Sequence, residues 1–243
     1  MNTHNEARIE RVKKTVGIIG GMGPLATADL FAKIVRFTAA GNDREHIHTI
    51  IDSNTAIPDR TAAILGLGPS PVPELVKSAQ LLENAGADLL VMPCNTAHFY
   101  YDDIRRATRL PLLHMLRLTA EEIELRALKK VALLATDGTV KTGIYARLFE
   151  ERGIPYVLPD EAGQSAVMDA IYAGVKAGRR DYDTSALRRA LDESMERGAE
   201  AFVLGCTELP VAFAQYRLDY PVVDPTETLA KAAIREAGYL LSQ

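Results

Sequence analysis

The chain has 243 residues, of which 47% are hydrophobic and 25% are charged, and its formal net charge at pH 7 is −4. This composition is that of a globular protein and excludes an intrinsically disordered chain. There is no excess of basic residues of the kind that binds nucleic acid, so a small-molecule partner is favoured. Residues 1–14 are polar and of mixed charge, which predicts a frayed tail with neither a secretory signal nor a membrane span, and therefore a cytoplasmic protein.

The first half of the chain after this tail alternates short apolar runs with segments of helical periodicity. The predicted strands are 15–20, 47–51, 88–92 and 112–113, and the predicted helices are 25–37, 74–85 and 97–108. The strands carry no polar face, which is typical of parallel sheets that helices cover on both sides.

The second half repeats this plan. Its predicted strands are 131–135, 156–158, 201–204 and 222–223, and its predicted helices are 140–152, 165–176, 184–197 and 227–241. The alternation predicts an α/β fold of two Rossmann-like halves. In such sheets the ligand site lies at the carboxyl ends of the strands.

Two matching segments carry the only cysteines of the chain, Cys94 and Cys206. Each segment opens with Gly-Ala and an acidic residue, continues as an apolar run, and reaches its cysteine eight positions after the glycine. A repeat with so long a period indicates a duplicated domain rather than a solenoid. We therefore expect one domain from residues 15–114 with 224–243, a second from 115–223, and an active site in the cleft between them.

A thiol at the turn from a strand to a helix faces unpaired backbone N–H groups, which stabilise the thiolate and lower its pKa. One such cysteine could equally be an inert core residue, but two at equivalent positions favour chemistry. Two thiols on opposite sides of a substrate carbon form a two-base system, in which one removes a proton and the other returns one. Asn95, Thr96 and Thr207, with the helix-start N–H groups, could hold the substrate carboxylate.

Two cations, Arg60 and Lys176, occupy similar positions in the two halves and could bind a carboxylate, although both could also be solvated surface charges. The Gly-rich segment 20–26 formally fits a dinucleotide-binding pattern, but Pro24 removes an N–H that a pyrophosphate would use, so the loop suits a smaller anion. His98 and His114 are interpreted as structural. The spacing of the cysteines and histidines does not favour a metal site.

These motifs together resemble the aspartate/glutamate racemase family. The resemblance is carried by Gly20-Gly21-Met22-Gly23-Pro24 and by residues 57–61, 92–98 and 205–208. Within it, residues 171–178 resemble the aspartate racemases. The resemblance implies a cofactor-independent, metal-free racemase, usually dimeric, that acts on an acidic amino acid. It implies catalytic Cys94 and Cys206, and side-chain carboxylate contacts from Arg60 and Lys176. It also implies α-carboxylate contacts from Asn95, Thr96 and the backbone around Met22, Gly23 and Ala97.

The sequence thus predicts interconversion of L- and D-aspartate. Racemisation of glutamate or of several amino acids stays open, because the loop 52–55 departs from the amide- and proline-rich loop expected there. A cysteine-pair redox sensor or binding protein is the alternative outside enzymes.

Overall fold

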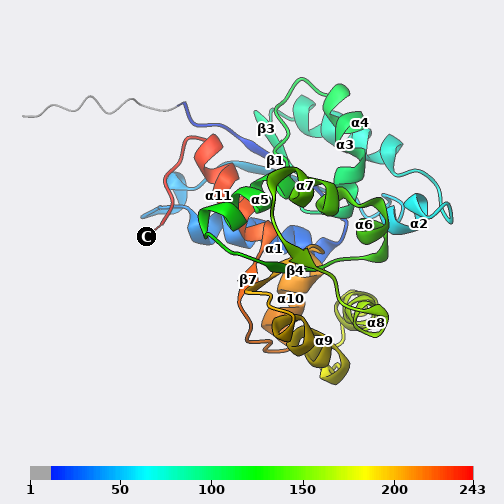
Figure 1. Cartoon of the computed structure of the whole chain (residues 1–243). Coiled ribbons are helices and arrows are strands. Elements are labelled where there is room, and N and C mark those ends of the chain that lie inside the picture. Colours follow the sequence, from blue (N-terminus) through cyan, green and yellow to red (C-terminus); the bar gives the residue numbers. More distant parts are fainter. Residues whose placement is uncertain (1–11, 243) are drawn as a thin grey trace, which may run out of the picture.

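The computed structural model describes residues 12–242 (Figure 1). The tail predicted for residues 1–14 therefore lies mostly outside the described residues. Residues 12–15 have no regular structure, but the Lys14 N–H already donates to the carbonyl of Ala237 (3.0 Å), so the chain is held from that point. No helix in the described part of the chain is long and apolar enough to cross a membrane.

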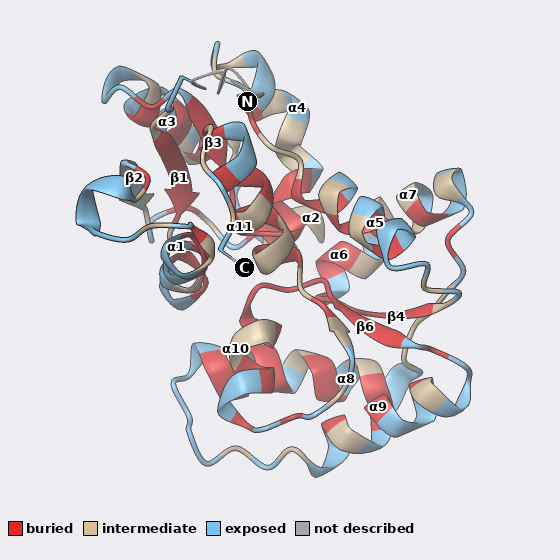
Figure 2. Cartoon of the chain, turned by 90° about the vertical axis from the view of Figure 1, so that its left-hand side faces the viewer, coloured by how far each residue is buried: buried red, intermediate tan, exposed pale blue. Residues whose placement is uncertain are grey.

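The first sheet has three parallel strands in the order β2-β1-β3, from β1 (Val16–Gly20), β2 (Thr49–Ser53) and β3 (Leu89–Val91). The predicted fourth strand at 112–113 is reduced to one parallel bridge between Leu112 and Leu90. β1 and β3 are buried throughout, as their apolar sequences predict (Figure 2). β2, predicted to be buried, is an edge strand and is partly exposed, with Ile51 39% accessible.

The second sheet has four parallel strands in the order β5-β4-β6-β7, from β4 (Val131–Leu134), β5 (Tyr156–Val157), β6 (Ala201–Leu204) and β7 (Val222–Val223). This order is the one found in the first sheet, with Leu112 in the place of β7. The α/β class and the pseudo-symmetric pair of parallel sheets are thus confirmed.

Helices flank both sheets. In the first half they are α1 (Pro24–Phe37), α2 (Arg60–Ile64), α3 (Val72–Asn84), α4 (Tyr101–Arg106) and α5 (Met115–Leu125), with 3₁₀ turns at Asp43–Glu45 and Thr96–Tyr100. In the second half they are α6 (Asp137–Thr142), α7 (Ile144–Arg152), α8 (Glu161–Asp169), α9 (Ser185–Glu196), α10 (Glu208–Gln215) and α11 (Pro225–Glu236), with a π-helical segment at Ala170–Lys176.

Several predicted helices differ in detail. The predicted helix 140–152 is two helices, because Gly143 adopts φ 63° and ends α6 with a left-handed residue. The predicted helix 165–176 begins earlier, at Glu161, and becomes π-helical at Ala170. The last helix ends at Glu236 rather than near 241. Two further helices, α2 and α5, are not among the predicted ones.

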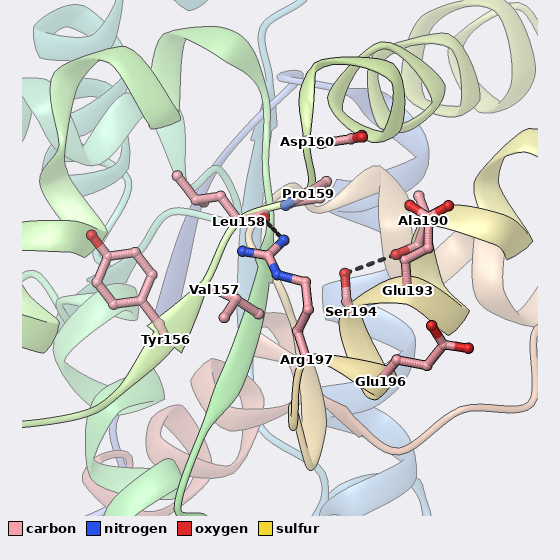
Figure 3. A pocket seen from close by; sticks show the side chains of 10 residues that line it. All are labelled: Tyr156, Val157, Leu158, Pro159, Asp160, Ala190, Glu193, Ser194, Glu196 and Arg197. Carbon is pink, nitrogen blue, oxygen red and sulfur yellow. Dashed lines mark hydrogen bonds between the residues drawn. The ribbon is translucent and has the colours of Figure 1, made fainter.

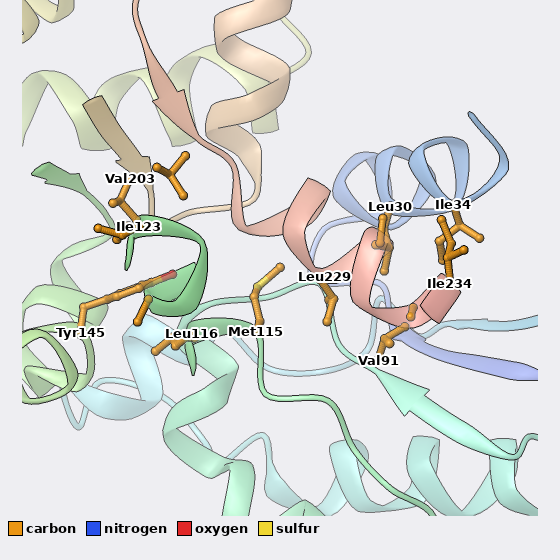
Figure 4. Packing of buried hydrophobic residues seen from close by; sticks show 14 of the residues in the cluster. Leu30, Ile34, Val91, Met115, Leu116, Ile123, Tyr145, Val203, Leu229 and Ile234 are labelled. Carbon is orange, nitrogen blue, oxygen red and sulfur yellow. The ribbon is translucent and has the colours of Figure 1, made fainter. Parts of the chain in front are cut away.

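Three apolar clusters hold the molecule together. One lies on the outer face of each sheet, and the central one draws residues from both halves, including Val91, Met115, Tyr145, Val203 and Leu229 (Figure 4). α11 packs on α1 and α5 within this central cluster, which returns the end of the chain to the first half as expected. The exact domain boundaries stay a prediction, because the central cluster belongs to both halves.

Candidate active site

One cavity lies at the carboxyl ends of the strands and encloses about 290 Å³ of empty space, part of it open to solvent. It is lined by Met22, Asp59, Arg60, Thr61, Cys94, Asn95, Thr96, Thr136, Tyr172, Lys176, Cys206, Thr207 and Glu208. Residues of both halves therefore form its wall, and both cysteines are among them.

The two cysteines occupy equivalent places after β3 and β6. Both are free thiols and nearly fully buried, with accessibilities of 5% for Cys94 and 6% for Cys206. Their loops touch directly, because the Thr207 hydroxyl donates to the carbonyl of Pro93 (3.2 Å). The duplicated motifs thus meet across one cavity, as the repeat predicts.

Cys206 is paired with the carboxylate of Glu208, a residue that is not among the predicted site residues. Its Sγ donates to Oε2 of Glu208 (3.0 Å), while Oε1 of Glu208 accepts from Nζ of Lys176 (2.7 Å). Burial is the largest cause that raises the pKa of Cys206 well above its usual value, and the charge of Glu208 adds to it. The lowered thiol pKa predicted from the helix start is therefore wrong for Cys206, because desolvation and Glu208 outweigh the neighbouring donors.

Arg60 begins α2 and is 8% accessible. Its guanidinium donates to the carbonyls of Pro58 (3.0 Å) and Met22 (3.2 Å), and its buried Nε has no partner within residues 12–242. Burial alone would lower the pKa of Arg60, but the nearby Cys94 and Asp59 outweigh it and raise the pKa. Arg60 is thus a fixed cation whose Nε is left unpartnered by the part of the chain that the structure describes.

Lys176 ends the π-helical segment and reaches the cavity from the second half. Burial would lower its pKa, but Glu208 and the cysteines raise it. Its ammonium also lies 5.5 Å from the ring centre of Tyr172, one turn earlier in the chain. Arg60 and Lys176 therefore line the same cavity. They reach it from different structures, because Arg60 begins a helix and Lys176 ends the π-helical segment.

Buried hydroxyls join the two halves beside the cysteines. Thr96 contacts Thr136 (3.1 Å) and Thr139 (2.8 Å), and Thr61 donates to Thr136 (3.4 Å). Asn95 is 1% accessible; its Oδ1 accepts from the hydroxyl of Tyr145 (2.6 Å), and its Nδ2 has no partner in the described part of the chain. The site thus holds buried donors that a ligand could satisfy.

Two predicted contacts do not line the cavity. Ala97 is fully buried. Gly23 lies next to a residue that lines the cavity, because a Cβ added at Gly23 would be 3.2 Å from Oε1 of Glu208. Met22 does line it, and its carbonyl accepts a hydrogen bond from Arg60. His98 and His114, interpreted as structural, are also outside the lining.

Five lining residues were absent from the predicted site: Asp59, Thr61, Thr136, Tyr172 and Glu208. Asp59 and Thr61 flank Arg60, and Tyr172 lies one helical turn before Lys176. Thr136 follows the end of β4, where a parallel sheet presents its ligand site. Glu208 follows Cys206 by two residues, so sequence proximity could have indicated each of them.

A larger and more open hollow, of about 1550 Å³ with the adjoining open solvent included, lies between β5 and α9. Figure 3 shows the side chains that line it. Arg197 uses its guanidinium there to bind the carbonyl of Leu158 (2.7 Å), and Ser194 donates to the carbonyl of Ala190 (2.7 Å). Neither cysteine lines this hollow, so size does not identify the site here.

Known proteins resemble this chain in sequence and in fold. The family model for Asp/Glu/hydantoin racemases matches residues 19–233. The chain belongs to the Asp/Glu/hydantoin racemase family. It is accordingly a racemase of the Asp/Glu type, and its fold matches that of solved members of this family.

Three relatives illustrate the membership. An aspartate racemase from Picrophilus torridus is 35% identical, with a TM-score of 0.82 over 94% of this chain and 96% of that one. An aspartate racemase homologue from Pyrococcus horikoshii OT3 is 28% identical, with a TM-score of 0.73 over 92% and 99%. The broad specificity amino-acid racemase RacX of Bacillus subtilis is 29% identical over 90% of this chain and 96% of its own.

Proposed function

We propose that the protein interconverts L- and D-aspartate, without pyridoxal phosphate, metal or nucleotide, by two-base proton transfer at Cα. The observation that carries the proposal is that two buried free thiols and two cations line one small cavity between pseudo-symmetric halves. Arg60 Nε and Asn95 Nδ2 are buried donors without partners in the described residues, which an anionic ligand would satisfy.

In the proposed reaction, one thiolate removes the α-proton, and the electron pair of the C–H bond moves into the α-carboxylate to give an enediolate. The opposite thiol then gives its proton to the other face of the carbon, and the electron pair returns to form the new C–H bond. General acid–base transfer contributes about 10²- to 10⁴-fold. Fixed donors must therefore also stabilise the enediolate, a role we assign to Asn95, Thr96 and Thr207.

The contacts of Glu208 indicate the protonation state of Cys206 before substrate binds. The raised pKa of Cys206 and its donation to Glu208 favour the thiol form on that side. Cys94, beside Arg60, would then act first as base, and Cys206 as acid. After one turnover Cys94 holds the proton and Cys206 has given its proton away. The enzyme is then in the form that the other enantiomer requires.

The two cations support an acidic substrate. Arg60 offers a buried guanidinium that could bind the side-chain carboxylate of aspartate, and Lys176 stands across the same cavity. The similarity to the aspartate racemase of Picrophilus torridus points to the same substrate. From the resemblance to this family we also propose a homodimer, which light scattering would test against the chain mass of 26.5 kDa.

One contact favours a second candidate, broad specificity. Lys176 is already neutralised by Glu208 at 2.7 Å, so Arg60 would be the main cation left for a second carboxylate. A site with only one uncommitted cation would discriminate less strongly against neutral side chains. The similarity to the broad specificity racemase of Bacillus subtilis is in line with this candidate.

Chiral chromatography of reduced, metal-free protein with L-aspartate, L-glutamate and several neutral amino acids would test both candidates. We expect aspartate to be the best substrate, and Arg60→Lys to reduce its kcat/KM by about tenfold or more, because an ammonium group cannot replace both the unpartnered Nε and the contacts with backbone carbonyls that fix the guanidinium. Equal turnover of neutral amino acids, unaffected by Arg60→Lys, would favour the second candidate. Absence of turnover, with reversible loss of both thiols on peroxide treatment, would favour a redox sensor.

A further inference from the structure

The side-chain amide of Asn95 is held by a residue from the other half of the molecule. Tyr145 stands in the first turn of α7 and is fully buried in the central cluster, where its ring lies 5.3 Å from that of Phe149 (Figure 4). Its hydroxyl reaches out of this apolar environment to Oδ1 of Asn95, at 2.6 Å. A buried phenol needs such a partner, and here the partner lines the cavity.

The direction of this hydrogen bond is given by the structure, in which the Tyr145 hydroxyl donates and Oδ1 of Asn95 accepts. Burial raises the pKa of the Tyr145 hydroxyl above its usual value, so the hydroxyl keeps its proton throughout the working pH range. A protonated phenol can donate or accept, and in the structure it donates to Oδ1 of Asn95 (2.6 Å), while Nδ2, which only donates, is turned away from it. An amide has two orientations of nearly the same shape, and the Tyr145 hydroxyl selects the one with Oδ1 turned toward α7.

The selected orientation leaves Nδ2 of Asn95 buried and unpartnered among the described residues, on a side chain that lines the cavity. The opposite orientation would turn an acceptor toward an anionic substrate. We propose that Tyr145 is a positioning residue, which orients the Asn95 amide so that Nδ2 donates to the substrate carboxylate. This inference rests on the proposed function, because it assigns the substrate carboxylate to Asn95.

A double-mutant cycle of Tyr145→Phe and Asn95→Ala, with racemisation as the readout, tests the inference. We expect Tyr145→Phe alone to lower kcat/KM by about 10- to 100-fold, the usual effect of losing a hydrogen bond to a charged group. In the Asn95→Ala background the same change should alter kcat/KM by less than about twofold, because no amide remains to be oriented. Equal effects in both backgrounds would overturn the inference and leave Tyr145 a packing residue.

Tyr216→Phe is the matched control. Its hydroxyl also donates to a single acceptor, the carbonyl of Arg179 at 2.7 Å, but Tyr216 lies outside the cavity lining. It should change kcat/KM by less than about twofold, as a change remote from the site does. A loss as large as that of Tyr145→Phe would mean that removing any buried hydroxyl has this effect, which would overturn the specific role.

A second readout does not depend on the substrate. The chain has six asparagines, so selective ¹⁵N labelling gives few side-chain amide signals, and Asn95→Ala assigns the one of interest. We expect the Asn95 amide pair to shift or broaden in Tyr145→Phe and to stay unchanged in Tyr216→Phe. Unchanged Asn95 signals in Tyr145→Phe overturn the inference even if no racemisation is found, whereas an inactive wild type with the expected shifts contradicts only the proposed function.

Discussion

Glu208 is the residue whose contacts most directly set the protonation of the site, because it binds both Cys206 and Lys176. Its charge is the second cause, after burial, that raises the pKa of Cys206. We predict that Glu208→Gln lowers the pKa of Cys206, as removal of a like charge does. Since racemisation needs Cys206 protonated in one direction, the alkaline limb of the kcat/KM profile should move to lower pH by the same amount.

Glu227→Gln provides the matched control for this experiment. Glu227 pairs with Lys231 (2.5 Å) on α11, outside the cavity, so its pH profile should coincide with that of the wild type. Because enantiomers have equal free energies, kcat/KM must be equal in the two directions, and either substrate serves for the measurement. An alkaline limb that stays in place in Glu208→Gln would rule out this role of Glu208.

At the scale of elements, His98 joins the turn after Cys94 to the start of α5. Its Nδ1 contacts the carbonyl of Cys94 (2.8 Å), and its Nε2 accepts from the N–H of Met115 (3.1 Å), so Nδ1 carries the proton. Burial is the main cause that lowers the pKa of His98 to about 3, and His114 adds to it. The ring is therefore neutral in the folded protein and fixes the loop that carries Cys94.

This contact predicts a pH dependence of stability. Between pH 6.5 and about 3 the unfolded chain binds one more proton at His98 than the folded chain does. The free energy of unfolding should therefore fall by up to about 1.4 kcal/mol per pH unit below pH 6.5 from this residue. Urea titrations from pH 8 to pH 4.5 measure the slope, and His98→Asn should have a lower stability at pH 8 but a shallower slope. A variant with the slope of the wild type would show that other groups cause the dependence.

For the whole molecule, the decisive feature is the seam between the two halves at the cavity. Gly138 of α6 faces Thr61 of α2 so closely that an added Cβ would lie 2.9 Å from the Cα of Thr61. We predict that Gly138→Ala separates the halves at this point and lengthens the contacts of Thr61 and Thr96 with Thr136. The value of kcat/KM should fall at least about tenfold, since misplacing reacting groups by about 1 Å has large effects on rate.

Gly41→Ala is the control for the seam. Gly41 is exposed, and its added Cβ would come no closer than 3.4 Å to a flexible Glu45 carboxylate. Its kinetics and unfolding midpoint should stay near those of the wild type. If Gly138→Ala were fully active at unchanged stability, the close fit of α6 on α2 would not matter for the reaction.

Much of this architecture could be predicted from the sequence, because its signals are local and duplicated. The apolar strands, the matching positions of Cys94 and Cys206, and the return of α11 to the first half follow from periodicity and repeat. The break at Gly143 could not be predicted, because a glycine within a helical pattern is compatible with a continuous helix. The edge position of β2 depends on strand order, which a single strand does not encode.

The residues of the candidate site could be predicted from the sequence better than their pKa values could. Eight of the ten proposed site residues line the cavity, because the repeat and the resemblance marked them together. The pKa of Cys206 was predicted in the wrong direction, since the contact with Glu208 and the burial of both groups arise only when the halves pack. The hydrogen bond from Tyr145 to Asn95 spans 50 positions in the chain and leaves no local pattern.

The most direct test of the two-base account is proton NMR of L-aspartate, and separately D-aspartate, in D₂O with reduced protein and no added cofactor. Wild type should exchange the α-proton of either enantiomer and form the opposite one. Cys94→Ala and Cys206→Ala should each abolish racemisation, while each variant should exchange the α-proton of only one enantiomer, a different enantiomer for each variant. Full racemisation by either variant would contradict the account.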